Sequence, residues 1–129
     1  MGSGNDLKVA HGFFDALGRG DRDAVLAVVT RDAVLWQNYD GQEKRFADRV
    51  SGLMRASQVA DGFRYAERQY LSIHDGLILQ HRLQGEIPGG DSFDAPIMVR
   101  VYMREGRMAR FEEYFDQQTL APLYRAMGK

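Results

Sequence analysis

The sequence predicts an α+β fold: a cone-shaped, curved antiparallel sheet of about five strands, wrapped around three helices from the N-terminal half and leaving an apolar pocket. Two observations lead to this prediction. Apolar residues recur at helical spacing through most of residues 6–57. From residue 63 to residue 116, apolar and polar residues instead alternate in four runs separated by turn sequences. Strands of ten or more residues twist, and helices laid on a curved sheet rarely fill its concave side.

Three helices are expected in the first half. The first is capped by Asn5 or Asp6 and ends at Gly18. Its apolar residues recur at intervals of three and four: Leu7, Ala10, Phe13, Phe14 and Leu17. Asp21 caps a short second helix, because its side chain can accept from an unpaired amide of the first turn. A third, amphipathic helix is expected from about Glu43 to Ser57.

A strand is expected at residues 32–38, ended by the turn signal at 39–41. One of its faces carries Val34, Trp36 and Asn38, the other carries Ala33, Leu35 and Gln37, and alternation does not choose which face points inward. Four further strands are expected at residues 63–73, 77–87, 93–104 and 107–116. Asp75-Gly76, Pro88–Asp91 and Glu105-Gly106 separate them, which predicts an antiparallel meander. A short terminal helix, capped by Thr119, is expected at 119–124.

The anomaly in this pattern is Glu113. In the last strand it shares a face with Ala109, Phe111 and Phe115, so a carboxylate is directed at the apolar side. Burying a carboxylate costs several kcal/mol, roughly, unless it is paired, hydrogen-bonded or wetted by a cavity. A small-molecule site explains such a carboxylate, and so does a structural ion pair or a position near the strand end.

The composition limits the function classes. The 129 residues are expected to form one domain, residues 1–129, and 17 basic residues are interleaved with 18 acidic ones. The net charge of -1 gives no reason to expect nucleic acid or a membrane surface as a partner. The sequence contains no cysteine, no signal-peptide pattern and no apolar run close to ~18 residues, so a cytoplasmic protein is expected. Neither the three histidines nor the glycines have metal-ligand or phosphate-loop spacing, so no metal and no cofactor is expected.

Three segments carry a resemblance to a known superfamily: residues 13–21, residues 32–38, and Gly106-Arg-Met-Ala-Arg-Phe-Glu-Glu-Tyr-Phe-Asp116. In this order and separation they resemble the SnoaL-like branch of the nuclear-transport-factor-2-like (NTF2-like), or ketosteroid-isomerase-like, superfamily. The resemblance covers about residues 6–124. It implies the cone fold, and a pocket that hosts isomerases, cyclases, epoxide hydrolases, dehydratases and non-catalytic binders in different members.

The resemblance also implies site residues. Ketosteroid isomerases have a tyrosine and an aspartate where this chain has Phe13 or Phe14 and Gln37 or Asn38, so that activity is not implied. Members similar to limonene-epoxide hydrolase place water-binding groups where Trp36 and Asn38 stand and an acid where Glu113 stands. Their Arg-x-Asp pair is replaced by Arg82-Leu83-Gln84, which lacks the second carboxylate.

SnoaL-type polyketide cyclases are similar in pairing an acid of the last strand with a histidine, and here His81 lies on the apolar face of residues 77–87. The expected catalytic residues are Glu113 as base with His81 and Asn38 as positioning or oxyanion groups. The expected substrate-binding residues are Trp36, Phe14, Phe111 and Phe115. A core histidine that only pairs structurally with Glu113 is the alternative.

Two function classes therefore remain open. The first is a cofactor-independent SnoaL-like enzyme acting on a small hydrophobic carbonyl, polyketide or epoxide-type substrate. The second is a non-catalytic protein of the same fold that binds a small hydrophobic ligand or serves as a dimerisation module. A homodimer through the outer sheet face is expected in either case, because that face mixes apolar, aromatic and arginine side chains. These are Met98, Arg100, Tyr102, Met108, Arg110 and Tyr114.

Overall fold

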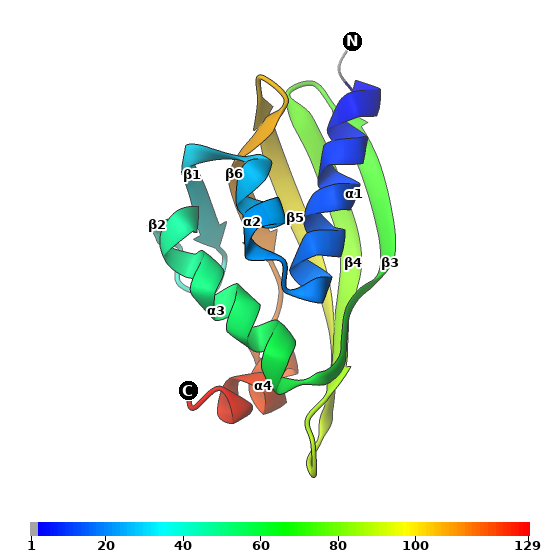
Figure 1. Ribbon diagram of the computed structural model, residues 1–129, viewed down its shortest axis with the longest axis vertical. Helices are drawn as coiled ribbons and strands as arrows, with labels where there is room; N and C mark the ends of the chain where they lie inside the picture. The colour runs from blue at the N-terminus through cyan, green and yellow to red at the C-terminus, as the bar shows by residue number, and fades with distance from the viewer. Residues whose placement is uncertain (1–2) are drawn as a thin grey trace.

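The computed structural model describes residues 3–129 and shows helices laid on one face of a six-stranded sheet (Figure 1). The elements follow one another as α1 (Ser3–Arg19), α2 (Arg22–Ala27), β1 (Val29–Gln37), β2 (Glu43–Arg45), α3 (Phe46–Val59), β3 (Asp61–Ile73), β4 (Gly76–Glu86), β5 (Ser92–Arg104), β6 (Arg107–Tyr114), the 3₁₀ helix η1 (Gln117–Leu120) and α4 (Ala121–Ala126). The mixed α+β class predicted from the sequence is confirmed.

The sheet has the strand order β2-β1-β6-β5-β4-β3. Strands β3 to β6 form the expected antiparallel meander. Strand β1 runs parallel to β6, so the sheet is mixed rather than purely antiparallel. Strand β2 was not predicted, because the charged residues 43–45 show no apolar alternation. Helix α3 therefore begins at Phe46 rather than at Glu43.

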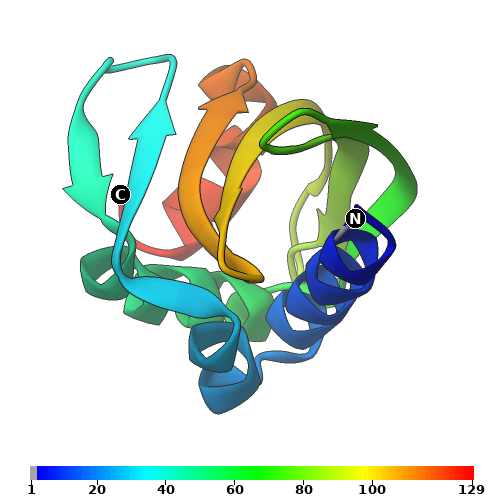
Figure 2. The same cartoon turned by 90° about the horizontal axis from the view of Figure 1, so that it is seen from above.

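Figure 2 shows the strands curving around the side that the helices cover. The core lies between the two layers: α1 buries its predicted stripe, including Phe13 and Phe14, against the sheet, and α3 buries Phe46 and Val50. Phe111 of β6 stacks between the helices, with ring centroids 5.2 Å from Phe13 and 5.0 Å from Phe46. The expectation of a curved sheet wrapped around N-terminal helices is thus confirmed.

Some helix ends differ from the prediction. Helix α1 begins at Ser3, so Asn5 and Asp6 lie in its first turns and are not its cap. Asp21 caps α2 as expected, since its carboxylate accepts from the amide of Ala24 at 3.2 Å. Asp116 instead of Thr119 caps the C-terminal segment, because η1 precedes α4 and starts earlier than the apolar pattern indicates.

The outer face also departs from the prediction at one residue. Met108 is fully buried, whereas its alternation with Arg110 placed it outside. A bulge explains the change: Tyr102 pairs with Arg110 but Met103 pairs with Met108, so Ala109 is an extra residue that reverses the alternation. None of the helices described between residues 3 and 129 has both the length and the apolar character that crossing a membrane requires.

Candidate functional site

Glu113 extends from β6 to the helix-covered side of the sheet, and Gln37 of β1 lies beside it. The parallel register pairs these two residues directly. Gln37 donates from Nε2 to Glu113 Oε1 at 2.7 Å, and its Oε1 accepts from the Tyr39 hydroxyl at 2.8 Å. Tyr39, Gln37 and Glu113 therefore form a directed hydrogen-bond chain that ends on the carboxylate.

The electrostatics of Glu113 are set by two opposing effects. Burial raises the pKa of its carboxyl, because the charged form loses water. The hydrogen bond from Gln37 lowers the pKa, because it favours the ionised form. Burial is the larger effect, so the pKa lies above the ordinary value of a glutamate. A carboxylate of this kind is a stronger base than one in water.

Two adjoining cavities meet at Glu113. The larger has a volume of about 110 Å³ and lies between β1, β6, α3 and α4. It is lined by Leu35, Gln37, Tyr39, Arg49, Gly52, Leu53, Ala56, Phe63, Tyr65, Leu83, Ile97, Glu113, Phe115, Leu120, Leu123, Tyr124, Met127 and Lys129. The smaller, of about 40 Å³, is lined by Phe13, Phe14, Leu17, Leu35, Phe46, Leu53, Tyr65, Val99, Phe111 and Glu113. An apolar cavity of about 150 Å³ holds benzene, and the two adjoining cavities together reach about this volume, which suits a small ring or chain.

The walls of both cavities include Tyr65 of β3. Burial, and secondarily the charge of Glu113, raises the pKa of this phenol, so it stays protonated at neutral pH. No side-chain hydrogen bond is formed by its hydroxyl with any residue between 3 and 129. Tyr124 of α4 lines the larger cavity, and burial followed by the charges of Tyr39 and Glu113 raises its pKa as well. The site thus combines one basic carboxylate with protonated phenols.

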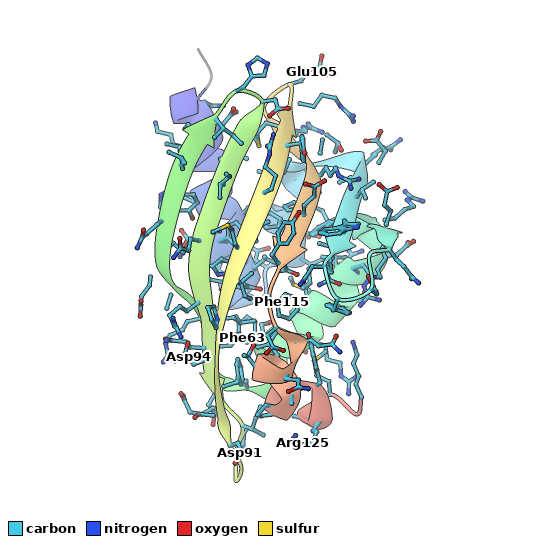
Figure 3. The ribbon with its side chains drawn as sticks, turned by 180° about the vertical axis from the view of Figure 1, so that it is seen from behind. Phe63, Asp91, Asp94, Glu105, Phe115 and Arg125 are labelled. Atoms are coloured by element: carbon cyan, nitrogen blue, oxygen red, sulfur yellow. The ribbon has the colours of Figure 1, made fainter. Side chains whose placement is uncertain are left out.

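Four of the residues expected from the sequence line these cavities. Glu113 lies at their junction, Phe14 and Phe111 line the smaller one, and Phe115 lines the larger one. Figure 3 shows Phe115 and Phe63 at the same end of the sheet, next to α4.

Trp36 and Asn38 are placed differently from the expectation. Strand β1 turns Leu35 and Gln37 inward, so Trp36 lies on the outer face, where its ring centroid is 5.2 Å from that of Tyr114. Asn38 accepts a 3.1 Å hydrogen bond at its Oδ1 from the amide of Phe115. That bond ties the end of β1 to the chain after β6, and neither residue lines a cavity.

His81 is on the inner face, as its alternation with Leu79 and Leu83 predicted, but it does not meet Glu113. Strand β5 separates β4 from β6, and neither imidazole nitrogen has a hydrogen-bond partner among residues 3–129. The ring packs 5.5 Å from Phe14 and 5.3 Å from Tyr65 and is only 2 % exposed. Burial and the nearby Arg68 lower its pKa to about 4. His81 therefore has a lowered pKa and packs against two residues that line the cavities, and it forms no hydrogen bond with Glu113.

Sequence reasoning missed Gln37, Tyr39, Arg49, Tyr65 and Tyr124 as site residues. Gln37 shares a strand face with Leu35, which was one of the two faces left open, and the others stand in segments whose pattern carries no chemical signal. Within residues 3–129, no three acidic or histidine side chains come close enough together to hold a metal ion.

No protein-family model and no curated protein sequence matches the chain. Solved structures do. An NTF2-like protein from Burkholderia xenovorans LB400 is 19 % identical, with TM-score 0.75, over 95 % of this chain and 98 % of that one. A protein from Shewanella denitrificans OS-217, provisionally named a SnoaL-like polyketide cyclase, is 14 % identical, with TM-score 0.72, over 94 % and 97 % of the two chains.

A protein with a ketosteroid isomerase-like fold from Catenulispora acidiphila DSM 44928, solved in complex with trimethylamine, is 15 % identical, with TM-score 0.72, over 88 % and 89 % of the chains. At these identities the likeness concerns the arrangement of the backbone. Together with the curved six-stranded sheet, it shows that the chain has the NTF2-like fold, the fold shared by SnoaL-like and ketosteroid isomerase-like proteins.

Proposed function

We propose that this protein is a cofactor-independent, single-domain enzyme that transfers a proton on a small, largely apolar carbonyl compound, with Glu113 as the general base. The observation that supports this most is the position of Glu113: a carboxylate with a raised pKa stands where two apolar cavities meet. Largely apolar cavities with a few convergent polar or ionisable groups are typical of small-molecule sites.

The proposed reaction begins at carbon. The Glu113 carboxylate removes a proton from the carbon next to the carbonyl, and the electron pair of the broken C–H bond moves to the carbonyl oxygen. Tyr65 lines both cavities, and its hydroxyl, which has no side-chain hydrogen-bond partner within residues 3–129, donates to that oxygen in this proposal. When the enolate is conjugated with a C=C bond, the protonated Glu113 returns the proton to the far carbon of that bond while the carbonyl re-forms. Alternatively the enolate carbon attacks a second carbonyl and closes a ring, and the oxygen of that carbonyl takes the proton from Glu113. The first outcome is an isomerisation and the second a cyclisation.

The comparisons fit this proposal at the level of the fold. One neighbour carries a provisional name as a SnoaL-like polyketide cyclase, and a cyclisation is one of the two outcomes proposed above. Opening of an epoxide by two acids is less well supported, because Glu113 is the only side-chain carboxylate among the residues that line the two cavities.

A non-catalytic binder of small hydrophobic ligands is the second candidate. It is favoured by one observation: His81 and Asn38, the expected helpers of Glu113, lie outside the cavity. In both cases we propose a homodimer through the outer face of the sheet, which Figure 3 shows free of α1, α2 and α3. Met98 and Tyr114, cross-strand neighbours on that face, are 44 % and 46 % exposed.

The test is hydrogen exchange at a model ketone. Deuterated 2-tetralone exchanges its α-deuterium for protons of the solvent, and proton NMR follows the growth of the α-proton signal. The rate is compared for the wild type, Glu113→Gln and Glu112→Gln. Glu112 is the matched control because it lies next to Glu113 on the opposite face, paired with Arg110. We expect the wild type and Glu112→Gln to accelerate exchange and Glu113→Gln to lose about 100-fold or more of it. Equal exchange with all three, or a Glu113 pKa at its ordinary value, would exclude the general base.

A further inference from the structure

We propose that Arg49 is an anion-binding subsite in the larger cavity, so that the preferred ligand is an amphipathic carboxylic acid. Its apolar body would fill the cavity and its carboxylate would bind the guanidinium, away from Glu113. The inference depends on the proposed function only in the question of which carbon of the ligand reacts. The binding of the carboxylate by Arg49 does not depend on it.

The first support is the helix face on which Arg49 lies. Four residues of α3 line the cavity, Arg49, Gly52, Leu53 and Ala56, and their spacing of three, four and seven places them on one side of a helix. The other charged residues of α3, Asp48 and Arg55, are exposed and do not line it. Arg49 is thus directed to the cavity by the same periodicity that directs Leu53 there.

The second support is that its guanidinium has no counter-charge. Arg49 is half-buried, yet it forms no ion pair and no side-chain hydrogen bond with any residue between 3 and 129. Asp40, whose pKa Arg49 helps to lower, is already bound by Lys44 Nζ at 2.5 Å. Glu113 in turn accepts from Gln37. A guanidinium carries five N–H donors in a planar fork that matches a carboxylate.

Two tyrosines of the larger cavity interact electrostatically with both Arg49 and Glu113. Tyr39 and Tyr124 both line the cavity. Burial is the main cause that raises the pKa of each; the charge of Glu113 also raises it, and the charge of Arg49 lowers it. Both charges therefore act on the same pair of phenols. Arg49 lines the larger cavity, as does Lys129, and Glu113 lies at its junction with the inner one. A ligand with an anionic end and a reactive carbonyl matches this polarity.

The third support is the space beside Arg49. A Cβ atom built on Gly52 would meet nothing within 4 Å, so the helix leaves a gap one turn away from the guanidinium. Flat apolar groups can lie against this gap while a carboxylate reaches Arg49. The cavity wall thus offers an apolar floor and a cationic end on one helix.

The experiment compares two probes of the same shape, 2-naphthoate and 2-acetylnaphthalene, which differ in the charge of one substituent. Their binding is measured by isothermal titration calorimetry with the wild type, Arg49→Gln, Arg49→Lys and Arg55→Gln. We expect the wild type and Arg55→Gln to prefer the carboxylate about 10-fold or more, a difference of about 1.4 kcal/mol. Arg49→Gln should lose this preference while keeping its affinity for the ketone, and Arg49→Lys should retain part of it.

The two proposals fail separately in these measurements. If Arg49→Gln keeps the preference, or if the wild type has none, the anion subsite is wrong even where Glu113 exchanges deuterium. If Glu113→Gln still prefers 2-naphthoate over 2-acetylnaphthalene, and loses this preference when Arg49 is also replaced, the anion subsite is supported. This holds whether or not the wild type exchanges the deuterium of 2-tetralone. Circular dichroism of each variant confirms that the fold is retained, and added NaCl should weaken only the carboxylate binding.

Discussion

Gln37 Nε2 lies 2.7 Å from Glu113 Oε1 across the parallel pair β1–β6. Because the two residues are direct register partners, the amide is held at the carboxylate by the sheet itself. Tyr39 orients the amide by donating to its oxygen at 2.8 Å, which leaves the NH₂ group directed at Glu113. Burial raises the pKa of Glu113, and the hydrogen bond from Gln37 therefore opposes part of that rise.

Replacing Gln37 by leucine should raise the pKa of Glu113 further. A hydrogen bond to a charged group contributes about 1.5–3 kcal/mol, which corresponds to roughly 1–2 pKa units. The measurement is a carbon-13 NMR titration of the side-chain carboxyl, assigned with Glu113→Gln. Tyr39→Phe is the matched control: it removes the bond to Gln37 but leaves the one to Glu113, so its shift should be smaller. An unchanged pKa in Gln37→Leu would contradict this role.

Replacing Glu113 by glutamine should stabilise the protein at neutral pH. The folded-state pKa is raised above the ordinary value of 4.5, so the folded protein binds the proton more tightly than the unfolded chain. Wild-type stability then falls as the pH rises from the unfolded pKa through the folded one, by about 1.4 kcal/mol for each unit between them. Urea unfolding at several pH values should show an advantage of Glu113→Gln that disappears in acid. An advantage that is the same at all pH values would have another cause.

The sequence located Glu113 but not its partner, and the reason is physical. Phe111 and Phe115 fix the buried face of β6, so the carboxylate between them had to point inward. In β1 both faces carry apolar residues, and Trp36, the largest, lies outside because Tyr114 of the neighbouring strand covers it. Which of two apolar faces is inside depends on the strand that pairs with it, and local alternation does not contain that information.

The failures at His81 and Met108 are of the same kind. His81 was placed on the correct face, but its distance from Glu113 depends on strand order, because β5 lies between them. Met108 was misplaced because a bulge at Ala109 reverses the alternation. At Arg49 the sequence carries no chemical signal, and only the cavity beside α3 shows that this residue borders the apolar side.

Replacing His81 by leucine should reduce the sensitivity of the fold to acid. The folded-state pKa of about 4 lies below the ordinary 6.5, so the unfolded chain binds a proton that the folded one resists. The contribution of His81 to the free energy of unfolding is fully present above pH 6.5. It is lost as the pH falls towards 4, by about 3 kcal/mol in total. Urea unfolding between these values should show that His81→Leu lacks this decline. His74→Leu, at an exposed turn position, is the control and should show the same decline as the wild type. If the free energy of unfolding of His81→Leu falls with pH as steeply as that of the wild type, this prediction is wrong.

A charge on the outer face should dissociate the proposed homodimer. Met98 and Tyr114 are cross-strand neighbours, and both remain largely exposed in the single chain. Tyr114→Glu would place a charge where two copies meet, so sedimentation velocity at micromolar concentrations should show a monomer. Leu71→Glu is the matched control, because Leu71 is 61 % exposed on β3, at the far end of the sheet from β1. A wild type that sediments as a monomer over this range would contradict the dimer.

Replacing Gly52 by alanine should separate stability from binding. Glycine inside a helix costs about 0.5–1 kcal/mol relative to alanine, and nothing lies within 4 Å of the added Cβ, so thermal unfolding should occur at a higher temperature. The same methyl group protrudes into the larger cavity, so binding of 2-naphthoate should weaken. Gly12→Ala is the matched control: Gly12 lies in α1, is exposed and has equal space, so it should stabilise without changing binding. If both variants bind the probe as the wild type does, the probe does not occupy this cavity.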